Sequence, residues 1–185
     1  MAYHFDALVF HVVAACGWGS TIMSEPQQVF ENVAKTLLST AWFQKGNWLT
    51  SVHPFPKKNP EAVTFHIFKR HWYNDDYQGI HVESFLTLDP QKRKSSYLTV
   101  HILHHDYVPG TKIRRRDIAR PIVDGCHEEI SKWDGYIFRA GKYGVQPFTK
   151  KLNGSDPGFE KILIREASRL CQHLGPIIDR TLWAF

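Results

Sequence analysis

Alternating apolar and polar residues dominate the stretch between residues 62 and 106. It contains three strand-like runs separated by two polar turns: AVTFHIFKRHWY, GIHVESFLTL and SSYLTVHILHHD. In the second run Ile80 and Val82 share one side of the strand, and His81 and Glu83 share the other. A period of two is typical of strands with one buried face. The pattern therefore predicts three consecutive antiparallel strands.

The polar loop at residues 89–94 is expected to join the second and third runs as a hairpin. The apolar sides of the two runs coincide when Val82 lies opposite Ile102. In that register Glu83 lies opposite His101, and both side chains point away from the apolar side. A shift of one residue would turn the whole apolar set to the wrong face, so the sequence favours this pairing.

The register of the first run stays open by one residue, because the turn at residues 74–79 does not fix the length of the connection. Either Lys69 or Arg70 then lies beside Glu83 on the neighbouring strand. If the three strands are neighbours in chain order, Glu83 has a cation on one side and a histidine on the other.

Helical spacing of apolar residues predicts three helices, at about residues 24–43, 118–134 and 155–174. Ser24 is suited to cap the first helix. Pro121 is tolerated best near a first turn, which places the start of the second helix near Ile118. Gly175 and Pro176 are expected to interrupt the third helix before it resumes as a short segment.

Consecutive strands followed by helices indicate an α+β fold, in which helices pack on one face of an antiparallel sheet of about 4–5 strands. Besides the meander at 62–106, a short strand is expected at 48–53 and an irregular one after residue 136. Residues 23–185 are interpreted as a single domain, and residues 1–22 as an extension or leader. The leader's apolar part is shorter than the roughly 20 residues that a membrane helix needs.

Composition changes this picture little. The 185 residues are 43% hydrophobic and 22% charged, which is ordinary for a globular domain and excludes a disordered or membrane-spanning chain. A formal net charge of +5 is compatible with an anionic partner without requiring one. The three cysteines form no CxxC pair, which favours a reducing compartment and a cytoplasmic location. Without zinc-finger spacing or RNP-like aromatic pairs, the sequence argues against nucleic-acid binding.

The polar side of the predicted hairpin is the candidate site, with Glu83 and His101 at its centre. A carboxylate beside an imidazole can transfer protons near neutral pH, so these two are the candidate catalytic residues. Their neighbours are candidate ligand-binding residues: His81, Phe85, Tyr97, Arg70 and Trp72. Imidazoles and a carboxylate also bind zinc or iron, and a divalent metal could be held by His81, Glu83, His101 and His105.

A simpler interpretation is an ion pair between Glu83 and a lysine or arginine, surrounded by surface histidines. The chain contains 11 histidines, which makes some clustering by chance expected. His104 and His105 point to opposite sides of a regular strand, so both cannot bind one ion unless the strand is distorted there.

Two functions remain open from the sequence. The first is a binding domain whose aromatic, histidine-bearing sheet face encloses a small molecule or meets a second copy of the chain. The second is a metal-assisted hydrolase or another enzyme that uses the same histidine and glutamate group. The sequence favours the binding domain, because it contains no metal motif of defined spacing and no nucleophile elbow.

Overall fold

The computed structural model describes residues 24–54, 62–138 and 146–185. This described part contains an antiparallel sheet with the strand order β1-β2-β3-β4-β6-β5. The strands are β1 (Trp48–Pro54), β2 (Ala62–Lys69), β3 (Ile80–Thr87), β4 (Ser96–Ile102), β5 (Tyr136–Phe138) and β6 (Phe148–Leu152). The predicted α+β fold is confirmed, with a sheet slightly larger than expected. The extension at residues 1–22 lies outside the described residues.

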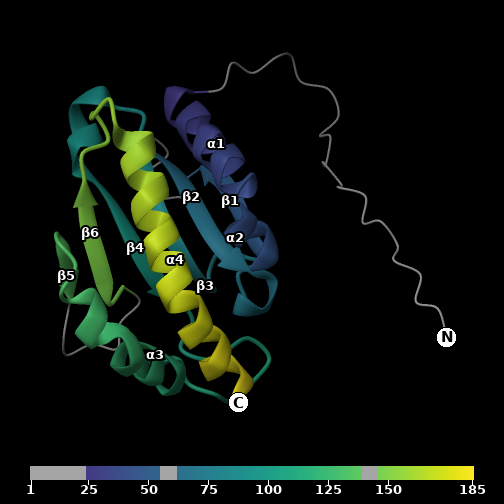
Figure 1. Ribbon diagram of the computed structural model, residues 1–185. Helices are drawn as coiled ribbons and strands as arrows, with labels where there is room; N and C mark the ends of the chain where they lie inside the picture. Colours follow the sequence, from purple (N-terminus) through teal and green to yellow (C-terminus); the bar gives the residue numbers. More distant parts are fainter. Residues whose placement is uncertain (1–23, 55–61, 139–145) are drawn as a thin grey trace, which may run out of the picture.

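The helices lie on one side of this sheet. They are α1 (Glu25–Leu38), α2 (Ala41–Lys45), α3 (Arg115–Ile130) and α4 (Phe159–Trp183), with the 3-10 turns η1 (Arg70–Trp72) and η2 (Pro90–Ser95). Figure 1 shows α1 and α4 side by side across the sheet, and α3 against α4 near one end. We call the face turned away from α1 and α4 the second face. Within the described residues it carries no helix.

The first predicted helix, at 24–43, is divided into α1 and α2. The hydroxyl of Ser39 donates to the carbonyl oxygen of Thr36, and that of Thr40 to the carbonyl oxygen of Leu37, each at 2.7 Å. Hydroxyl groups that bond to nearby backbone compete with helix continuation. The two polar side chains therefore account for the break, which the apolar spacing did not reveal.

The predicted start of the second helix near Ile118 is wrong, because α3 begins at Arg115. The Asp117 carboxylate accepts a hydrogen bond of 3.3 Å from the backbone N–H of Arg114, which is half of a capping box. Pro121 consequently lies inside the helix.

The predicted interruption at Gly175 and Pro176 is also wrong, because α4 continues through both residues. Packing accounts for the difference. A side-chain carbon on Gly175 would lie 2.8 Å from the Trp48 ring, so glycine lets the helix backbone approach the indole closely. On either side of this contact Leu174 and Ile178 are fully buried. Burying these side chains offsets the cost of about 3 kcal/mol of an interior proline.

The β3–β4 pairing differs from the predicted one by a shift of two residues, since Val82 lies opposite Val100 instead of Ile102. The turn η2 lies in the connection and ends directly before β4. A shift by an even number keeps every side chain on its predicted face. Glu83 therefore stays on the second face, but its direct partner is Thr99.

The β2–β3 pairing also differs from prediction, because His66 lies opposite Glu83 in place of Lys69 or Arg70. The turn η1 begins directly after β2 and lengthens the connection, which moves β2 along β3. Lys69 instead forms an ion pair with Asp179 of α4 at 2.6 Å. The expected cation beside the glutamate is therefore replaced by an imidazole.

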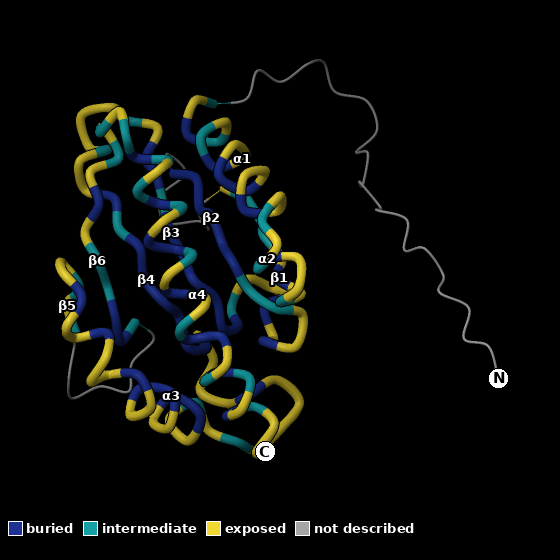
Figure 2. The backbone as a smooth tube through the Cα atoms, viewed as in Figure 1, coloured by how far each residue is buried: buried dark blue, intermediate teal, exposed yellow. Residues whose placement is uncertain are grey.

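The central strands are buried on both faces (Figure 2). Residues 62–67 of β2 are all buried, and in β3 and β4 only Phe85 and Tyr97 are partly exposed. One set of alternate residues packs under the helices, as the apolar pattern predicts. The other set contains the histidines and Glu83, so the polar side of the sheet is enclosed rather than open to solvent.

None of the helices in the described residues is long and apolar enough to cross a membrane. Cys126 and Cys171 are buried free thiols on α3 and α4. Burial raises the pKa of Cys126 to about 12, so this thiol packs and does not react at neutral pH.

Candidate functional site

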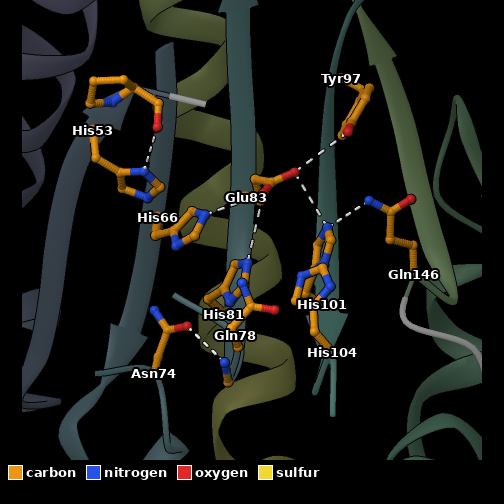
Figure 3. A network of polar contacts seen from close by, with 12 residues as sticks. His53, His66, Asn74, Gln78, His81, Glu83, Tyr97, His101, His104 and Gln146 are labelled. Carbon is orange, nitrogen blue, oxygen red and sulfur yellow. Dashed lines mark hydrogen bonds and ion pairs between the residues drawn. The ribbon is translucent and has the colours of Figure 1, made fainter. Parts of the chain in front are cut away.

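Glu83 lies at the centre of a polar network on the second face, with α4 behind the strands (Figure 3). One carboxylate oxygen, Oε2, lies 3.2 Å from Nε2 of His66 and 3.8 Å from Nε2 of His81. The other, Oε1, lies 3.3 Å from Nε2 of His101. The Tyr97 hydroxyl donates to Oε1 at 3.5 Å. Three neighbouring strands thus bring four polar side chains to one carboxylate.

The histidines form a row of rings across the strands. The His66 and His81 ring centroids are 3.8 Å apart, and those of His81 and His101 are 4.8 Å apart, with nearly parallel planes in both pairs. These spacings are close to the distance of about 4.8 Å between adjacent strands. His53 of β1 extends the row, with its ring edge-on to His66 at 4.6 Å. We call these rings, together with His104, the imidazole row.

His104 joins the imidazole row because the backbone turns sharply after β4. Leu103 has a φ of 55°, in the left-handed region that bulky residues rarely adopt. This turn brings Nε2 of His104 to 2.8 Å from Nδ1 of His101. His105 points elsewhere and pairs with Asp76 at 3.2 Å, half-exposed to solvent.

Burial and hydrogen bonding set the charge of the site. Burial raises the pKa of the Glu83 carboxyl, but its contacts with the imidazoles of His101, His66 and His81 outweigh burial and hold the pKa well below its usual range. Burial lowers the pKa of His66, although contact with Glu83 opposes it, and lowers that of His81 further. Burial, followed by the nearby His101, lowers the pKa of His104 to about 4. At neutral pH the site therefore combines a negative carboxylate with neutral rings at His66, His81 and His104.

A cavity of about 230 Å³ lies in front of Glu83. Residues outside the imidazole row form part of its wall: Thr64, Tyr77, Gln78, Tyr97 and Gln146. The Tyr77 ring stacks on His53 at 4.0 Å, and Gln146 forms a hydrogen bond with His101. The cavity has the size of a small organic molecule or a few waters, and the carboxylate borders it.

Several polar atoms around this cavity are buried without a hydrogen-bond partner in the described part of the chain. They are Oγ1 of Thr64, Nε2 of His53, Nδ1 of His66 and both ring nitrogens of His81. Burying a polar group without a partner costs about 1–3 kcal/mol. Such groups occur where they lower the stability of the fold, or where a bound ligand or ion supplies the missing interaction.

The sequence-predicted site residues are only partly brought together. His81, Glu83 and His101 converge, and Tyr97 borders the cavity, with Phe85 packed edge-on against its ring at 4.4 Å. The structure does not bring the other three predicted residues to this site. Arg70 is exposed in η1, Trp72 is buried in the core beside Asp179, and His105 lies outside the imidazole row.

Residues that sequence reasoning missed come from outside the predicted hairpin or from its irregular end. His66 and His53 lie on β2 and β1, and Tyr77 and Gln146 lie outside the strands. His66 shares its alternation with Phe68 and Arg70, so a correct β2 register would have placed it beside Glu83. The sequence carries no comparable signal for His104, because a positive φ at a leucine is not expected from its side chain.

Replacing His81 with leucine is expected to raise the free energy of unfolding by about 1 kcal/mol. The His81 side chain is fully buried with both ring nitrogens unpaired in the described structure, and leucine removes that cost at similar volume. Chemical denaturation of both proteins measures the difference. His105→Leu, at a half-exposed ring, is the control and should change stability by less than about 0.5 kcal/mol. A clear loss of stability in His81→Leu would show that the ring has a bonding partner.

The site is assembled from residues that are far apart in the sequence. His66, Glu83 and His101 lie on three strands, and Gln146 lies just before β6. No short motif of fixed spacing describes such a set. No family model, curated protein or solved structure matches this chain.

Proposed function

We propose that this domain binds a small cationic or hydrogen-bond-donating ligand in the cavity around Glu83. The observation that carries the proposal is a buried carboxylate at the border of a cavity of about 230 Å³. A charge removed from water is costly unless it is paired. The neutral rings of His66 and His81 contact this carboxylate without adding a positive charge, so a positively charged or donating ligand would be stabilised there.

The cavity wall supports the same chemistry. Partnerless Oγ1 of Thr64 and Nε2 of His53 offer bonding positions that a ligand could satisfy. The rings of Tyr77 and His53 are stacked and form a flat wall. Aromatic faces attract cations, by about 0.5–2 kcal/mol depending on exposure. Small-molecule sites commonly combine such walls with a few convergent polar groups.

A screen of small amines and guanidines against protein kept in EDTA tests this proposal. We expect at least one compound to raise the melting temperature and to shift amide NMR signals of residues such as Thr64, Tyr77 and Gln146. The same compound should lose its effect on Glu83→Gln, because the variant keeps the shape and removes the charge. His105→Asn is the matched control and should bind as the wild type does. Shifts elsewhere on the protein, or equal binding by Glu83→Gln, would contradict the proposal.

A metal-assisted hydrolase remains the second candidate, and one observation favours it. His101 lies between the buried carboxylate and His104, with Nδ1 2.8 Å from His104 and Nε2 3.3 Å from Glu83. Such a chain could move a proton between the outer ring and the cavity through His101, with Glu83 as a ligand of the metal. This role requires a metal ion or another activating group at the cavity.

A further inference from the structure

We propose that His66, His81 and Glu83 form a binding site for a divalent transition-metal ion, with His101 as a positioning residue for the carboxylate. This inference rests on the proposed ligand cavity and names the cation that the cavity takes. The three side chains come from β2 and β3 and are all buried.

The donor types select the class of metal. Two imidazole nitrogens and one carboxylate oxygen are the ligands of zinc sites with an open position and of iron(II) sites of the facial-triad kind. Calcium and magnesium prefer sites built from oxygen atoms, usually several carboxylates and carbonyls. One carboxylate among imidazoles therefore fits a first-row transition metal better than either of these ions.

The separations between the donor atoms fit one ion. Ligand atoms about 2.1 Å from a tetrahedral zinc ion lie about 3.4 Å from one another. The distances from Oε2 of Glu83 are 3.2 Å to His66 and 3.8 Å to His81. All three donor atoms lie within 4.8 Å of one another. The two distances from Oε2 therefore differ by only a few tenths of an ångström from the separation of ligands on one ion.

To bind one ion, the His66 and His81 rings have to rotate. Within the described part of the chain, this rotation breaks no hydrogen bond of the ring nitrogens that do not bind the metal. The His66 and His81 planes are 17° apart, so their lone pairs point side by side instead of converging. Nδ1 of His66 and both nitrogens of His81 have no partner within the described residues. The His81 ring in particular is completely buried, and neither of its nitrogens has a hydrogen-bond partner among these residues. A bound ion would remove the free-energy cost of burying these nitrogens without a partner.

His101 would act on the metal through Glu83. Its Nε2 lies 3.3 Å from Oε1, the carboxylate oxygen that faces away from His66 and His81. Partners of this kind orient a ligating carboxylate, and losing one typically weakens metal affinity by about 10–100-fold. Because Glu83 and His66 border the cavity, water or a small ligand could occupy the remaining coordination positions.

A second donor group, His81, His101 and His104, is less suited to the ion. One nitrogen atom from each of its three rings also lies within 4.8 Å of the others, but the group contains no carboxylate and His104 is exposed. Two of its nitrogens are already bonded to each other at 2.8 Å. The test below therefore includes a His104 variant.

Isothermal titration of untagged, EDTA-stripped protein with zinc chloride tests the site. The wild type should bind one equivalent, and His66→Asn and His81→Asn should each weaken binding by more than about 100-fold. His101→Asn should weaken it by about 10–100-fold. His105→Asn is the control and should bind as the wild type does. His104→Asn distinguishes the two donor groups and should weaken binding less than His66→Asn does. Circular dichroism establishes that each variant is folded.

Cobalt(II) substitution provides a readout that needs no variant. In the wild type it should give a visible d–d absorption band and paramagnetically shifted NMR signals from two histidine imidazoles. Absence of saturable zinc binding, or loss of binding in His104→Asn with retention in His66→Asn, would overturn the proposed ligand set. Amine binding in EDTA without zinc binding would reject the metal site alone, whereas failure of both would also reject the ligand cavity.

Discussion

Asp179→Ala is expected to lower the free energy of unfolding by about 3 kcal/mol at pH 7, which corresponds to a melting temperature lower by roughly 10 °C. The Asp179 carboxylate of α4 receives three hydrogen bonds from the end of β2 and from η1. The donors are Nζ of Lys69 at 2.6 Å, Nε2 of His71 at 2.8 Å and Nε1 of Trp72 at 2.8 Å. Trp72 is fully buried, so its indole N–H would lose its partner in a place without water.

This effect should depend on pH in a definite direction. Burial raises the pKa of Asp179, but the hydrogen bonds from Lys69, Trp72 and His71 outweigh it and leave the pKa lowered. A carboxyl whose folded pKa is lowered stabilises the fold above its usual value of about 3.9. That stabilisation is lost as the pH falls through the folded pKa. The difference between wild type and Asp179→Ala should therefore be largest at neutral pH and shrink below about pH 4.

Urea unfolding at several pH values, followed by tryptophan fluorescence, measures this difference. Asp124→Ala is the matched control, because Asp124 pairs with Arg120 at 3.7 Å on the exposed side of α3. Exposed pairs of this kind contribute about 0–1 kcal/mol. Equal effects of the two substitutions, or a difference that grows in acid, would show that Asp179 does not hold α4 to the sheet.

Glu83→Ala is expected to lower the free energy of unfolding by about 3 kcal/mol and to abolish binding of both amines and zinc. The substitution removes the acceptor shared by His66 and His101 in a buried site, and unpaired buried groups cost about 1–3 kcal/mol or more. Differential scanning calorimetry of EDTA-treated protein measures the loss of stability separately from any bound ion.

Glu83→Gln separates structure from charge at the same position. The amide keeps one acceptor oxygen and the side-chain volume, so it should cost less stability than alanine while still losing cation binding. Glu128→Ala is the control for removal of an acidic group, since Glu128 is exposed on α3 and pairs with Lys132 just beyond the end of that helix. A Glu83→Ala protein as stable as the wild type, or one that still binds zinc with unchanged affinity, would be incompatible with the proposed role.

Much of the fold could be predicted from local pattern. The meander strands, the short strand at 48–53 and three helical segments follow from periodicity, because a buried face repeats every second residue in a strand and every three to four in a helix. Boundaries were less predictable. Ser39 and Thr40 end α1 through hydroxyl contacts, and the packing of Trp48 against Gly175 carries α4 past Pro176.

The sequence predicted the two central residues of the candidate site, but it did not predict all of the residues around them. Glu83 and His101 were expected to meet on the second face, and they do, although diagonally and not as direct cross-strand partners. His66 and His104 were not expected, since one depends on the β2 register and the other on the left-handed turn at Leu103.

The sequence by itself determined which face each residue of β3 and β4 occupies. The reason is that side chains alternate along a strand, so an apolar core face assigns the polar residues to the opposite face in any register that buries the core. Only the tertiary structure decided how far each strand slides along its neighbour, because shifts by two or four residues preserve the alternation. The turns η1 and η2 and the packing of α4 fixed those shifts, and with them the partners of Glu83.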